Sequence, residues 1–363
     1  MVEAKATLAN WRTAPHNRRA FHHVRELVPS ADIPNDRRRV RELAAQPVGL
    51  DLDRFLEQTG TDGMAIVHRG RLVFERYANG MTPQAPHILM SVSKSMLGLL
   101  AGMLDLDAER RITDFVPELQ KSAYRGATVR HLLDMRAGVA FDEDYVATSG
   151  PIVEYRKATG WNPPGPGEQP SDLHAFLISL EEMDAPHGGR MHYVSPNSDL
   201  LGWVIERATG RRYAELMSEL VWQAAGAEYS AYITVDRLGA PRCAGGMCVT
   251  LRDLARVGQW VIETKAGFLE DIRRNGDPQA WAAGDMAAYF PGLPMRYRSQ
   301  WYLQEGEAPL YLGYGIHGQF LFVDPRNALV IAKLSSQAAP MDTARIGLAM
   351  RAVSEIRKSL ALA

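Results

Sequence analysis

Short apolar runs with the character of β-strands lie near both ends of the chain. Residues 64–68 and 72–77, which an Arg-Gly-Arg turn separates, predict a β-hairpin. Residues 318–323 and 329–334, which an Asp-Pro-Arg-Asn turn joins, predict a second hairpin. A final helix is predicted over about 342–362, because apolar residues recur there at helical spacing. Strands at both ends predict one antiparallel sheet to which the first and last parts of the chain contribute.

The part of the chain between the two hairpins carries the helical period instead. An apolar helix begins at Ser91, and further helices are predicted over 128–135, 199–207 and 250–258. Ser198 is expected to be the N-cap of the helix at 199–207, because its side chain can accept a hydrogen bond from the first turn. The middle of the chain is therefore predicted to be mostly helical.

These patterns predict a mixed α/β fold of the α+β kind. Residues 1–50 are expected to form an arm that wraps the body. Residues 51–90 and 300–363 would form the sheet region, and residues 91–299 would form a mostly helical region inserted between its two halves. The helix that begins at Ser91 would then start at the seam between sheet and helices.

The composition is that of an ordinary soluble globular chain. Its 363 residues are 46% hydrophobic and 23% charged, which is enough for a substantial core. The net charge of −1 leaves no basic footprint for nucleic acid or an anionic membrane, and acidic neighbours dilute the arginines at 18–19 and 37–39. Small neutral molecules are therefore the expected partners, and neither nucleic acid nor a membrane is expected.

Two kinds of motif that the sequence lacks, a secretory signal and a metal-binding spacing, bear on the location of the protein and on metal binding. The first residues contain no apolar stretch typical of a secretory signal, so a cytoplasmic location is expected. Cys243 and Cys248 are the only cysteines, and they lack the paired spacing of a zinc site. His187 and His192 are not at metalloprotease spacing. We expect neither a metal nor another cofactor.

One candidate for catalysis is the serine at the start of the first apolar helix. Residues three apart share a helix face, so the Ser91 hydroxyl and the Lys94 amine can meet. A serine in the first turn also lies where unpaired backbone N–H groups and the helix dipole favour a developing oxyanion. The spacing is common by chance, and the alternative is a helix capped by Ser91 or Ser93 with a solvated Lys94.

A tyrosine ahead of the helix predicted at 199–207 could complete this chemistry. A phenol can act as general base for a serine when a nearby ammonium lowers its pKa from about 10. Lys94 could supply that ammonium to Tyr193. The alternative is a tyrosine at the edge of the core whose hydroxyl is simply hydrogen-bonded.

Taken in order, these segments resemble the serine β-lactamase and penicillin-binding superfamily, in its class C β-lactamase and esterase branch. Ser91-Val92-Ser93-Lys94 matches the S-x-x-K motif of the nucleophile, and Tyr193 heads the segment that matches the Y-x-N motif. Further segments similar to this branch are residues 128–133, 195–202 and 245–247. The resemblance covers about residues 50 to 360 and implies the β-lactamase/transpeptidase-like fold.

Two positions depart from the pattern of this branch. Ser195 stands where the amide of Y-x-N is expected, with Asn197 two positions further on. No K-T-G occurs on the strand of the third motif, where residues 315–319 read Gly-Ile-His-Gly-Gln, and this removes the cation that would hold a β-lactam carboxylate. The variant, together with residues 141–145 and 160–161, is similar to the subgroup that contains the 6-aminohexanoate-dimer hydrolases, which cleave nylon-oligomer amides and also carboxyl esters.

The resemblance implies a metal-free serine hydrolase that acts on a small amide or carboxyl ester. In the implied mechanism, Lys94 as an ammonium stabilises a tyrosinate at Tyr193, which takes the proton of Ser91 during attack on the carbonyl. The backbone N–H groups of Ser91 and Ile316 would hold the oxyanion.

Four further side chains are candidates for substrate binding. Ser195 and Asn197 follow the tyrosine, His317 lies in the variant third motif, and Trp161 starts a loop rich in proline and glycine. A structural histidine is the alternative for His317. The acidic turn at 142–144 is expected to be a solvated loop rather than an acid/base pair.

Two other functions stay open. The chain could be a non-catalytic binding or sensor protein on the same fold, or, among enzymes, a β-lactamase or D-alanyl peptidase. The retention of Ser91, Lys94 and Tyr193 favours catalysis. The absence of a signal sequence disfavours cell-wall substrates. A homodimer is compatible with the sequence.

Overall fold

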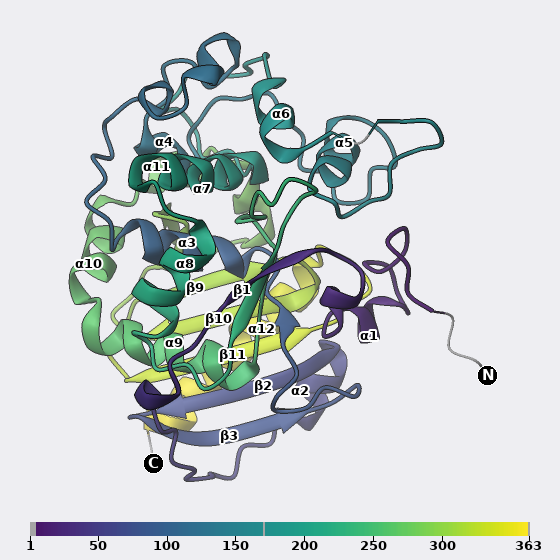
Figure 1. Ribbon diagram of the computed structural model, residues 1–363. Coiled ribbons are helices and arrows are strands. Elements are labelled where there is room, and N and C mark those ends of the chain that lie inside the picture. Colours follow the sequence, from purple (N-terminus) through teal and green to yellow (C-terminus); the bar gives the residue numbers. More distant parts are fainter. Residues whose placement is uncertain (1–4, 170, 362–363) are drawn as a thin grey trace.

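A seven-stranded antiparallel sheet forms the centre of the structure, a computed structural model that describes residues 5–169 and 171–361 (Figure 1). Its strands are β2 (Thr61–His68), β3 (Arg71–Tyr77), β7 (Met295–Arg298), β8 (Trp301–Gln304), β9 (Leu310–Gly315), β10 (Gln319–Asp324) and β11 (Leu329–Ser335). They lie in the order β3-β2-β11-β10-β9-β8-β7. Because β2 pairs with β11, His68 lies opposite Leu329. The prediction of one sheet completed by both ends of the chain is confirmed.

Successive residues of the central strands are buried on opposite faces of this sheet. Met64 of β2 joins one hydrophobic cluster, and Ala65 joins the other. Helices α2 (Asp53–Gln58) and α12 (Thr343–Ala361) contribute side chains to the first cluster, and α9 (Leu251–Thr264) packs on β2, β10 and β11 from the other side. A strand covered on both faces needs apolar residues at successive positions, which explains the continuous apolar runs in the sequence.

A smaller antiparallel sheet joins the N-terminal arm to the middle of the chain. In spatial order its strands are β1 (Ser30–Ile33), β5 (Ala231–Thr234), β6 (Met247–Val249) and β4 (His87–Ile88). The described part of the arm therefore contributes a strand, because Ser30 pairs with Thr234.

The expected boundary between sheet and helices differs from the structure. Residues 91–299, expected to be mostly helical, also contain β5, β6 and β7. The large sheet thus resumes at Met295 rather than at residue 300, because β7 pairs with β8 across the turn at Ser299 and Gln300. Strands of three or four residues are too short for their periodicity to stand out in a sequence.

Helix α1 (Asn17–Ala20) lies in the N-terminal arm (Figure 1). The other α-helices come from the part of the chain between β3 and β7, and they are α3 (Val92–Ala101), α4 (Val129–Leu133), α5 (Pro151–Ala158), α6 (Leu173–Ile178), α7 (Ser195–Thr209), α8 (Tyr213–Leu216), α10 (Ala266–Asn275) and α11 (Pro278–Ala282). Among residues 5–169 and 171–361, no helix has both the length and the apolar character needed to cross a membrane.

Helix α7 begins earlier than the sequence predicts. Val194 is the N-cap residue, and Pro196 lies in the first turn, where its missing N–H costs no helical hydrogen bond. The prediction that Ser198 caps this helix is therefore wrong. Ser198 lies inside α7, where its hydroxyl donates to Gln300 Oε1 at 2.7 Å.

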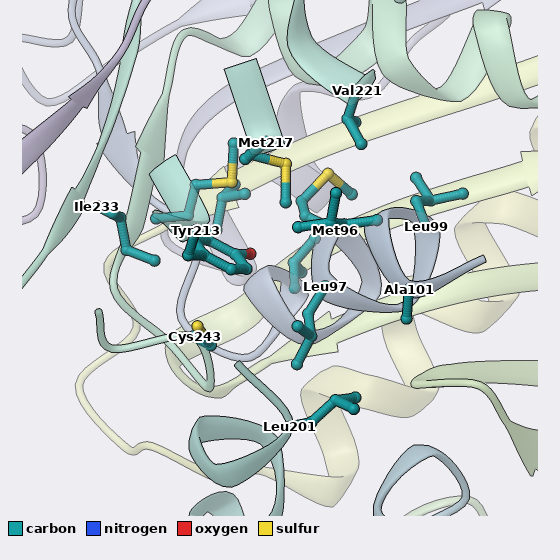
Figure 2. Close-up of a cluster of buried hydrophobic side chains, with 14 of the residues drawn as sticks. Met96, Leu97, Leu99, Ala101, Leu201, Tyr213, Met217, Val221, Ile233 and Cys243 are labelled. Carbon is teal, nitrogen blue, oxygen red and sulfur yellow. The ribbon is translucent and has the colours of Figure 1, made fainter. Parts of the chain in front are cut away.

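Helix α3 is buried along its whole length. Figure 2 shows Met96, Leu97 and Leu99 of this helix packed among side chains from other elements, which include Leu201, Tyr213, Met217, Val221 and Ile233. A Cβ at Gly98 would lie 2.1 Å from the carbonyl oxygen of Ser299, so glycine lets the β7–β8 turn press against α3. Close packing on all sides holds the polar start of the helix in one position.

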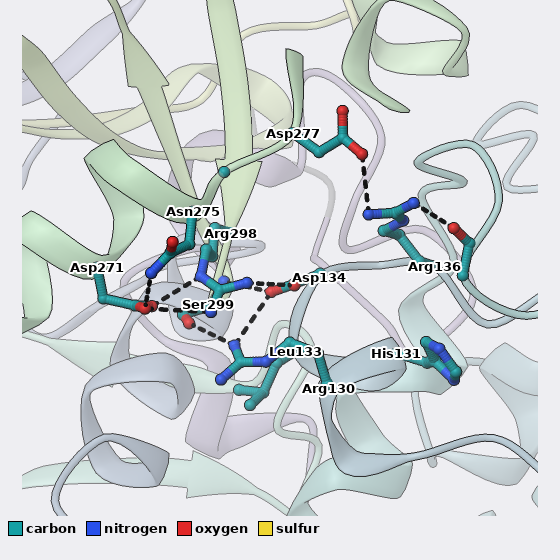
Figure 3. A network of polar contacts seen from close by, with 12 residues as sticks. Arg130, His131, Leu133, Asp134, Arg136, Asp271, Asn275, Asp277, Arg298 and Ser299 are labelled. Carbon is teal, nitrogen blue, oxygen red and sulfur yellow. Dashed lines mark hydrogen bonds and ion pairs between the residues drawn. The ribbon is translucent and has the colours of Figure 1, made fainter. Parts of the chain in front are cut away.

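A polar network fixes the β7–β8 turn to α4 and α10 (Figure 3). Asp134, at the end of α4, accepts from the backbone N–H of Ser299 at 3.0 Å and from Arg298 Nη1 at 3.0 Å. Arg298 also donates to Asp271 of α10. Burial raises the pKa of Asp134, and Arg130 and Arg298 oppose this shift. Because the Ser299 carbonyl rests against α3, the network also helps to hold that helix.

Candidate active site

The start of α3 carries Ser91 beside the end of β4. Met90 has a left-handed backbone conformation with φ 45°. Ser91 follows it as the N-cap residue of α3, but its side chain makes no capping hydrogen bond. The capping alternative therefore does not describe the Ser91 hydroxyl, and the Ser93 hydroxyl instead accepts from the backbone N–H of Met247 at 3.1 Å.

Two glycines let β9 approach the start of α3. A Cβ at Gly315 would lie 2.9 Å from the backbone nitrogen of Ser91, and a Cβ at Gly313 would lie 2.7 Å from Ser95 Oγ. Real Cβ atoms do not sit that close to such atoms without a shift, so both positions need glycine for space. The end of β9, and with it Ile316, consequently lies close to the backbone N–H of Ser91.

Lys94 is buried among three hydrogen-bond acceptors. Its Nζ donates to Ser91 Oγ at 2.9 Å, to Ser195 Oγ at 3.1 Å and to the carbonyl oxygen of Ala244 at 2.8 Å. Burial lowers the pKa of Lys94 to about 7, although Glu143 opposes the shift. A large share of the amine is therefore neutral near pH 7. The alternative of a solvated lysine is wrong.

Tyr193 lies just before α7, with its ring beside the lysine. Lys94 Nζ is 4.8 Å from the centre of that ring. Burial raises the pKa of Tyr193, while contacts with the hydroxyls of Ser91 and Tyr302 act in the opposite direction. Burial opposes both charges of the expected pair of a tyrosinate and an ammonium. The three hydrogen bonds that Lys94 Nζ donates, in contrast, correspond to the protonated amine. The charge state of the pair stays a prediction.

Asp285 fixes the segment that carries Tyr193. Its Oδ2 accepts from the backbone N–H of Tyr193 at 3.1 Å and lies 2.8 Å from Nδ1 of His192. The His192 Nε2 lies 3.1 Å from the carbonyl oxygen of Phe141. These contacts leave His192 in a positioning role.

Glu143 belongs to the site, contrary to the expectation of a solvated acidic turn. Its carboxylate accepts from the Ser195 hydroxyl at 2.5 Å and from the Ser195 backbone N–H at 2.8 Å. A continuous chain of hydrogen bonds therefore runs from Ser91 through Lys94 and Ser195 to Glu143. No residue spacing in the sequence points to Glu143, because it lies in a loop that only the fold brings to α7.

Two of the side chains suggested for substrate binding have structural partners instead. Asn197 is fully buried, and its Oδ1 accepts from the Tyr124 hydroxyl at 3.0 Å. His317 Nδ1 donates to the carbonyl oxygen of Gln337 at 2.7 Å, and its ring packs edge-on against Phe21. Burial lowers the pKa of His317 to about 4, so it is neutral at physiological pH.

A small pocket opens at Ser91 and brings several expected residues together. Ser195, Trp161 and Ile316 all line it with Ser91. The Trp161 indole N–H donates to Thr234 Oγ1 at 3.1 Å, which fixes the ring as a wall of the pocket. The assignment of the Ile316 backbone N–H to an oxyanion hole stays a prediction.

Three arginines also line this pocket, and the sequence singled out none of them. Arg242 is ion-paired with Asp199. Arg12 comes from the N-terminal arm, and Arg156 from α5. Arg12 and Arg156 also line a wider outer groove, which shares Ile316 with the pocket. Residues so far apart in the chain meet only through the tertiary fold.

Comparisons with known proteins agree with this geometry. The Beta-lactamase family model matches residues 40–354. A 6-aminohexanoate-dimer hydrolase of Paenarthrobacter ureafaciens is 35% identical over 356 residues, which are 92% of this chain and 89% of that protein. A D-aminopeptidase of Brucella anthropi is 26% identical over 237 residues, which are 59% of this chain and 43% of that protein. A solved structure from Bacillus anthracis, assigned as a 6-aminohexanoate-dimer hydrolase, is 26% identical and covers 99% of both chains with a TM-score of 0.88.

Proposed function

This chain belongs to the Beta-lactamase family and is a serine hydrolase, and from that premise we propose that it cleaves a small amide or carboxyl ester through an acyl-enzyme on Ser91. The observation that carries the proposal is the 2.9 Å contact between Lys94 Nζ and Ser91 Oγ in a pocket. Relatives named 6-aminohexanoate-dimer hydrolase and D-aminopeptidase support an amide carbonyl as the point of attack. An ester is attacked by the same acyl-transfer chemistry.

Acylation starts from neutral Lys94. As Ser91 Oγ attacks the substrate carbonyl carbon, its proton passes to Lys94 Nζ and the carbonyl oxygen becomes an oxyanion. The backbone N–H groups of Ser91 and Ile316 stabilise that charge. Each such donor accounts for roughly 10² to 10³ in rate. The assignment of the base to Lys94 replaces the tyrosinate of the sequence-based mechanism.

Tyr193 acts as the acid. When the tetrahedral intermediate collapses, the phenol donates its proton to the leaving nitrogen or oxygen and recovers a proton from the Lys94 ammonium. Water then attacks the acyl-enzyme and gives its proton to neutral Lys94. Ser91 Oγ leaves with a proton from Tyr193, which Lys94 again replaces. Both groups thus end the cycle in the neutral forms in which they began.

A β-lactamase or D-alanyl peptidase is the less favoured enzyme. The strand position of K-T-G carries Gly315, Ile316 and His317, and the neutral His317 is bonded to the Gln337 carbonyl. The lysine with which the K-T-G motif would hold a β-lactam carboxylate is therefore missing from this strand. A sensor protein differs from an enzyme in a simpler way, because its acyl group would stay on Ser91.

The test compares hydrolysis of 4-nitrophenyl acetate and butyrate, the linear 6-aminohexanoate dimer and nitrocefin by wild type, Ser91→Ala and Tyr193→Phe. We expect ester or linear-amide turnover by wild type, loss of turnover in both variants, and no turnover of nitrocefin. Ser354→Ala, an exposed serine on α12, is the matched control and should behave as wild type. Equal rates for wild type and Ser91→Ala would refute the nucleophile. Permanent labelling of Ser91 without turnover would favour the sensor.

A further inference from the structure

Arg12 is a desolvated cation at the edge of the pocket. The carbon of its guanidinium lies 5.7 Å from the Trp11 ring centre and 5.8 Å from that of Trp161. Its Nη2 donates to Asn162 Oδ1, while its Nε is buried and has no hydrogen-bond partner. Burial, with the charges of the neighbouring arginines, lowers the pKa of Arg12 to about 9. Arg12 therefore places a positive charge, and an Nε–H group without an acceptor, at the edge of the pocket.

A second guanidinium with similar properties lies close by. Arg156 donates to the carbonyl oxygens of Ala147, Asp144 and Tyr145. Within residues 5–169 and 171–361, the hydrogen bonds of Arg12 and Arg156 go to an amide and to carbonyls, and none goes to a carboxylate. Carbonyl oxygens fix the position of a guanidinium but do not cancel its charge.

The acidic groups near the pocket are fewer than the arginines that line it. Asp199 is ion-paired with Arg242. Glu143 binds Ser195, and its charge acts on Lys94 and on Arg156. Two carboxylates, Asp199 and Glu143, thus face three arginines, and Arg12 adds a positive charge that neither of them pairs with. Buried cations are rarely left without an anion in proteins, so this excess calls for an anionic ligand.

We propose that Arg12 and Arg156 bind a carboxylate carried by the substrate, so that the preferred substrate is an amide or ester with a second, anionic end. The inference rests on the proposed function, because it places the scissile carbonyl at Ser91. Both guanidinium groups line the pocket at Ser91 and also the outer groove, so a bound carboxylate would lie in the same pocket as the scissile carbonyl. A planar guanidinium suits a carboxylate, to which it can donate two parallel hydrogen bonds.

The carboxylate could belong to the acyl group or to the leaving group, and two matched pairs of esters distinguish these sources. The acyl pair is the 4-nitrophenyl monoester of adipic acid and 4-nitrophenyl hexanoate, which have the same chain length. The leaving-group pair is the butyrate ester of 4-hydroxybenzoate and that of 4-hydroxybenzamide. In each pair the readout is the ratio of kcat/KM for the anionic ester to kcat/KM for the neutral ester.

We expect Arg12→Gln to lower that ratio about tenfold or more in one of the two pairs, because a charge-assisted hydrogen bond is lost. Arg12→Lys keeps a positive charge, so its ratio should lie between those of wild type and Arg12→Gln. Arg18→Gln, which changes an exposed arginine of the same arm, should leave both ratios as in wild type. Both kcat/KM values of a ratio are measured on the same variant, so a loss of folded enzyme lowers both equally and cancels in the ratio.

Equal ratios in wild type and Arg12→Gln in both pairs would overturn the carboxylate site while leaving the hydrolase intact. A wild-type enzyme that prefers the neutral ester in both pairs would also overturn it. If no ester of either pair is cleaved faster by wild type than by Ser91→Ala, the proposed function itself fails, and the carboxylate site fails with it.

Discussion

Lys94 shows, at the scale of a single residue, how burial lowers the pKa of an ordinary side chain toward neutrality. An exposed lysine has a pKa near 10.4 and holds its proton at neutral pH. Inside the start of α3, the amine of Lys94 loses its hydration, and its pKa falls to about 7. The same burial raises the pKa of Tyr193. One physical cause therefore moves both pKa values in the direction that the proposed roles of base and acid require.

The first prediction concerns the pH dependence of this base. Because only neutral Lys94 can take the proton of Ser91, kcat/KM for 4-nitrophenyl butyrate should rise with pH along a one-proton limb with its midpoint near pH 7. Steady-state rates between about pH 5 and 9 measure this limb. Lys94→Arg keeps a charge that cannot be released and should reduce kcat/KM by roughly 10² to 10⁴. A rate that falls with pH through this range would contradict the role of Lys94.

The second prediction concerns Glu143, whose negative charge raises the pKa of Lys94 against the effect of burial. Glu143→Gln removes that charge but keeps an oxygen for the Ser195 hydroxyl. The midpoint of the pH limb should therefore move to lower pH, by about half a unit to one unit. Asp142→Asn changes the neighbouring exposed carboxylate and should leave the midpoint unchanged. A midpoint that moves to higher pH would show that the sign of the coupling is wrong.

At the scale of elements, the site depends on how closely β9 approaches α3. The contact is set by the missing side chains at Gly313 and Gly315, because even one methyl group would meet atoms of α3 or its first turn. Glycine is used here for space, since Gly315 has an ordinary extended backbone with φ −132°. Glycine at these two positions therefore sets the distance between the Ser91 N–H and the end of β9.

The third prediction is that Gly315→Ala separates the two elements. Its Cβ would lie 2.7 Å from the Leu89 carbonyl oxygen, so we expect the free energy of unfolding to fall by about 1 to 3 kcal/mol. Activity should fall as well, because an oxyanion donor moves. Gly267→Ala in α10 is the matched control: nothing lies within 4 Å of its Cβ, and it should stabilise by roughly 0.5 to 1 kcal/mol. Urea unfolding with ester kinetics measures both, and equal stability of the two variants would contradict the steric argument.

Local patterns could predict the elements but not the neighbours that loops supply. The two hairpins and the contact between Ser91 and Lys94 could be predicted, because each depends on residues close together in the chain. Glu143 and Arg12 could not, since a loop and an arm reach the pocket only through distant packing. The lowered pKa of Lys94 could not be predicted for the same reason, as burial is a property of the whole fold.

At the scale of the whole molecule, the N-terminal arm supports the pocket wall. The buried Trp11 donates from Nε1 to the carbonyl oxygen of Trp161 at 3.0 Å, and the two rings pack edge-on. Further along the arm, Asn17 Nδ2 donates to the carbonyl oxygens of Ser336 and Gln337. The arm thus links the pocket to the segment after β11.

The fourth prediction follows from this support. Trp11→Ala should lower the free energy of unfolding by about 3 to 5 kcal/mol and raise KM for esters, because Trp161 loses its neighbour. Urea unfolding and steady-state kinetics measure the two effects. Leu238→Ala removes a side chain that is 65% exposed and should change neither. Unchanged stability in Trp11→Ala would mean that the arm is not part of the cooperative fold.

The pairing of β2 with β11 also has a consequence for protein synthesis. The ribosome makes β2 and the proposed nucleophile at the start of α3 well before β9, β10 and β11. The large sheet cannot close, and the proposed oxyanion side of the site cannot form, until those later strands leave the exit tunnel. A nascent chain therefore exposes the unpaired edge of β2 until β11 arrives, and such edges favour aggregation.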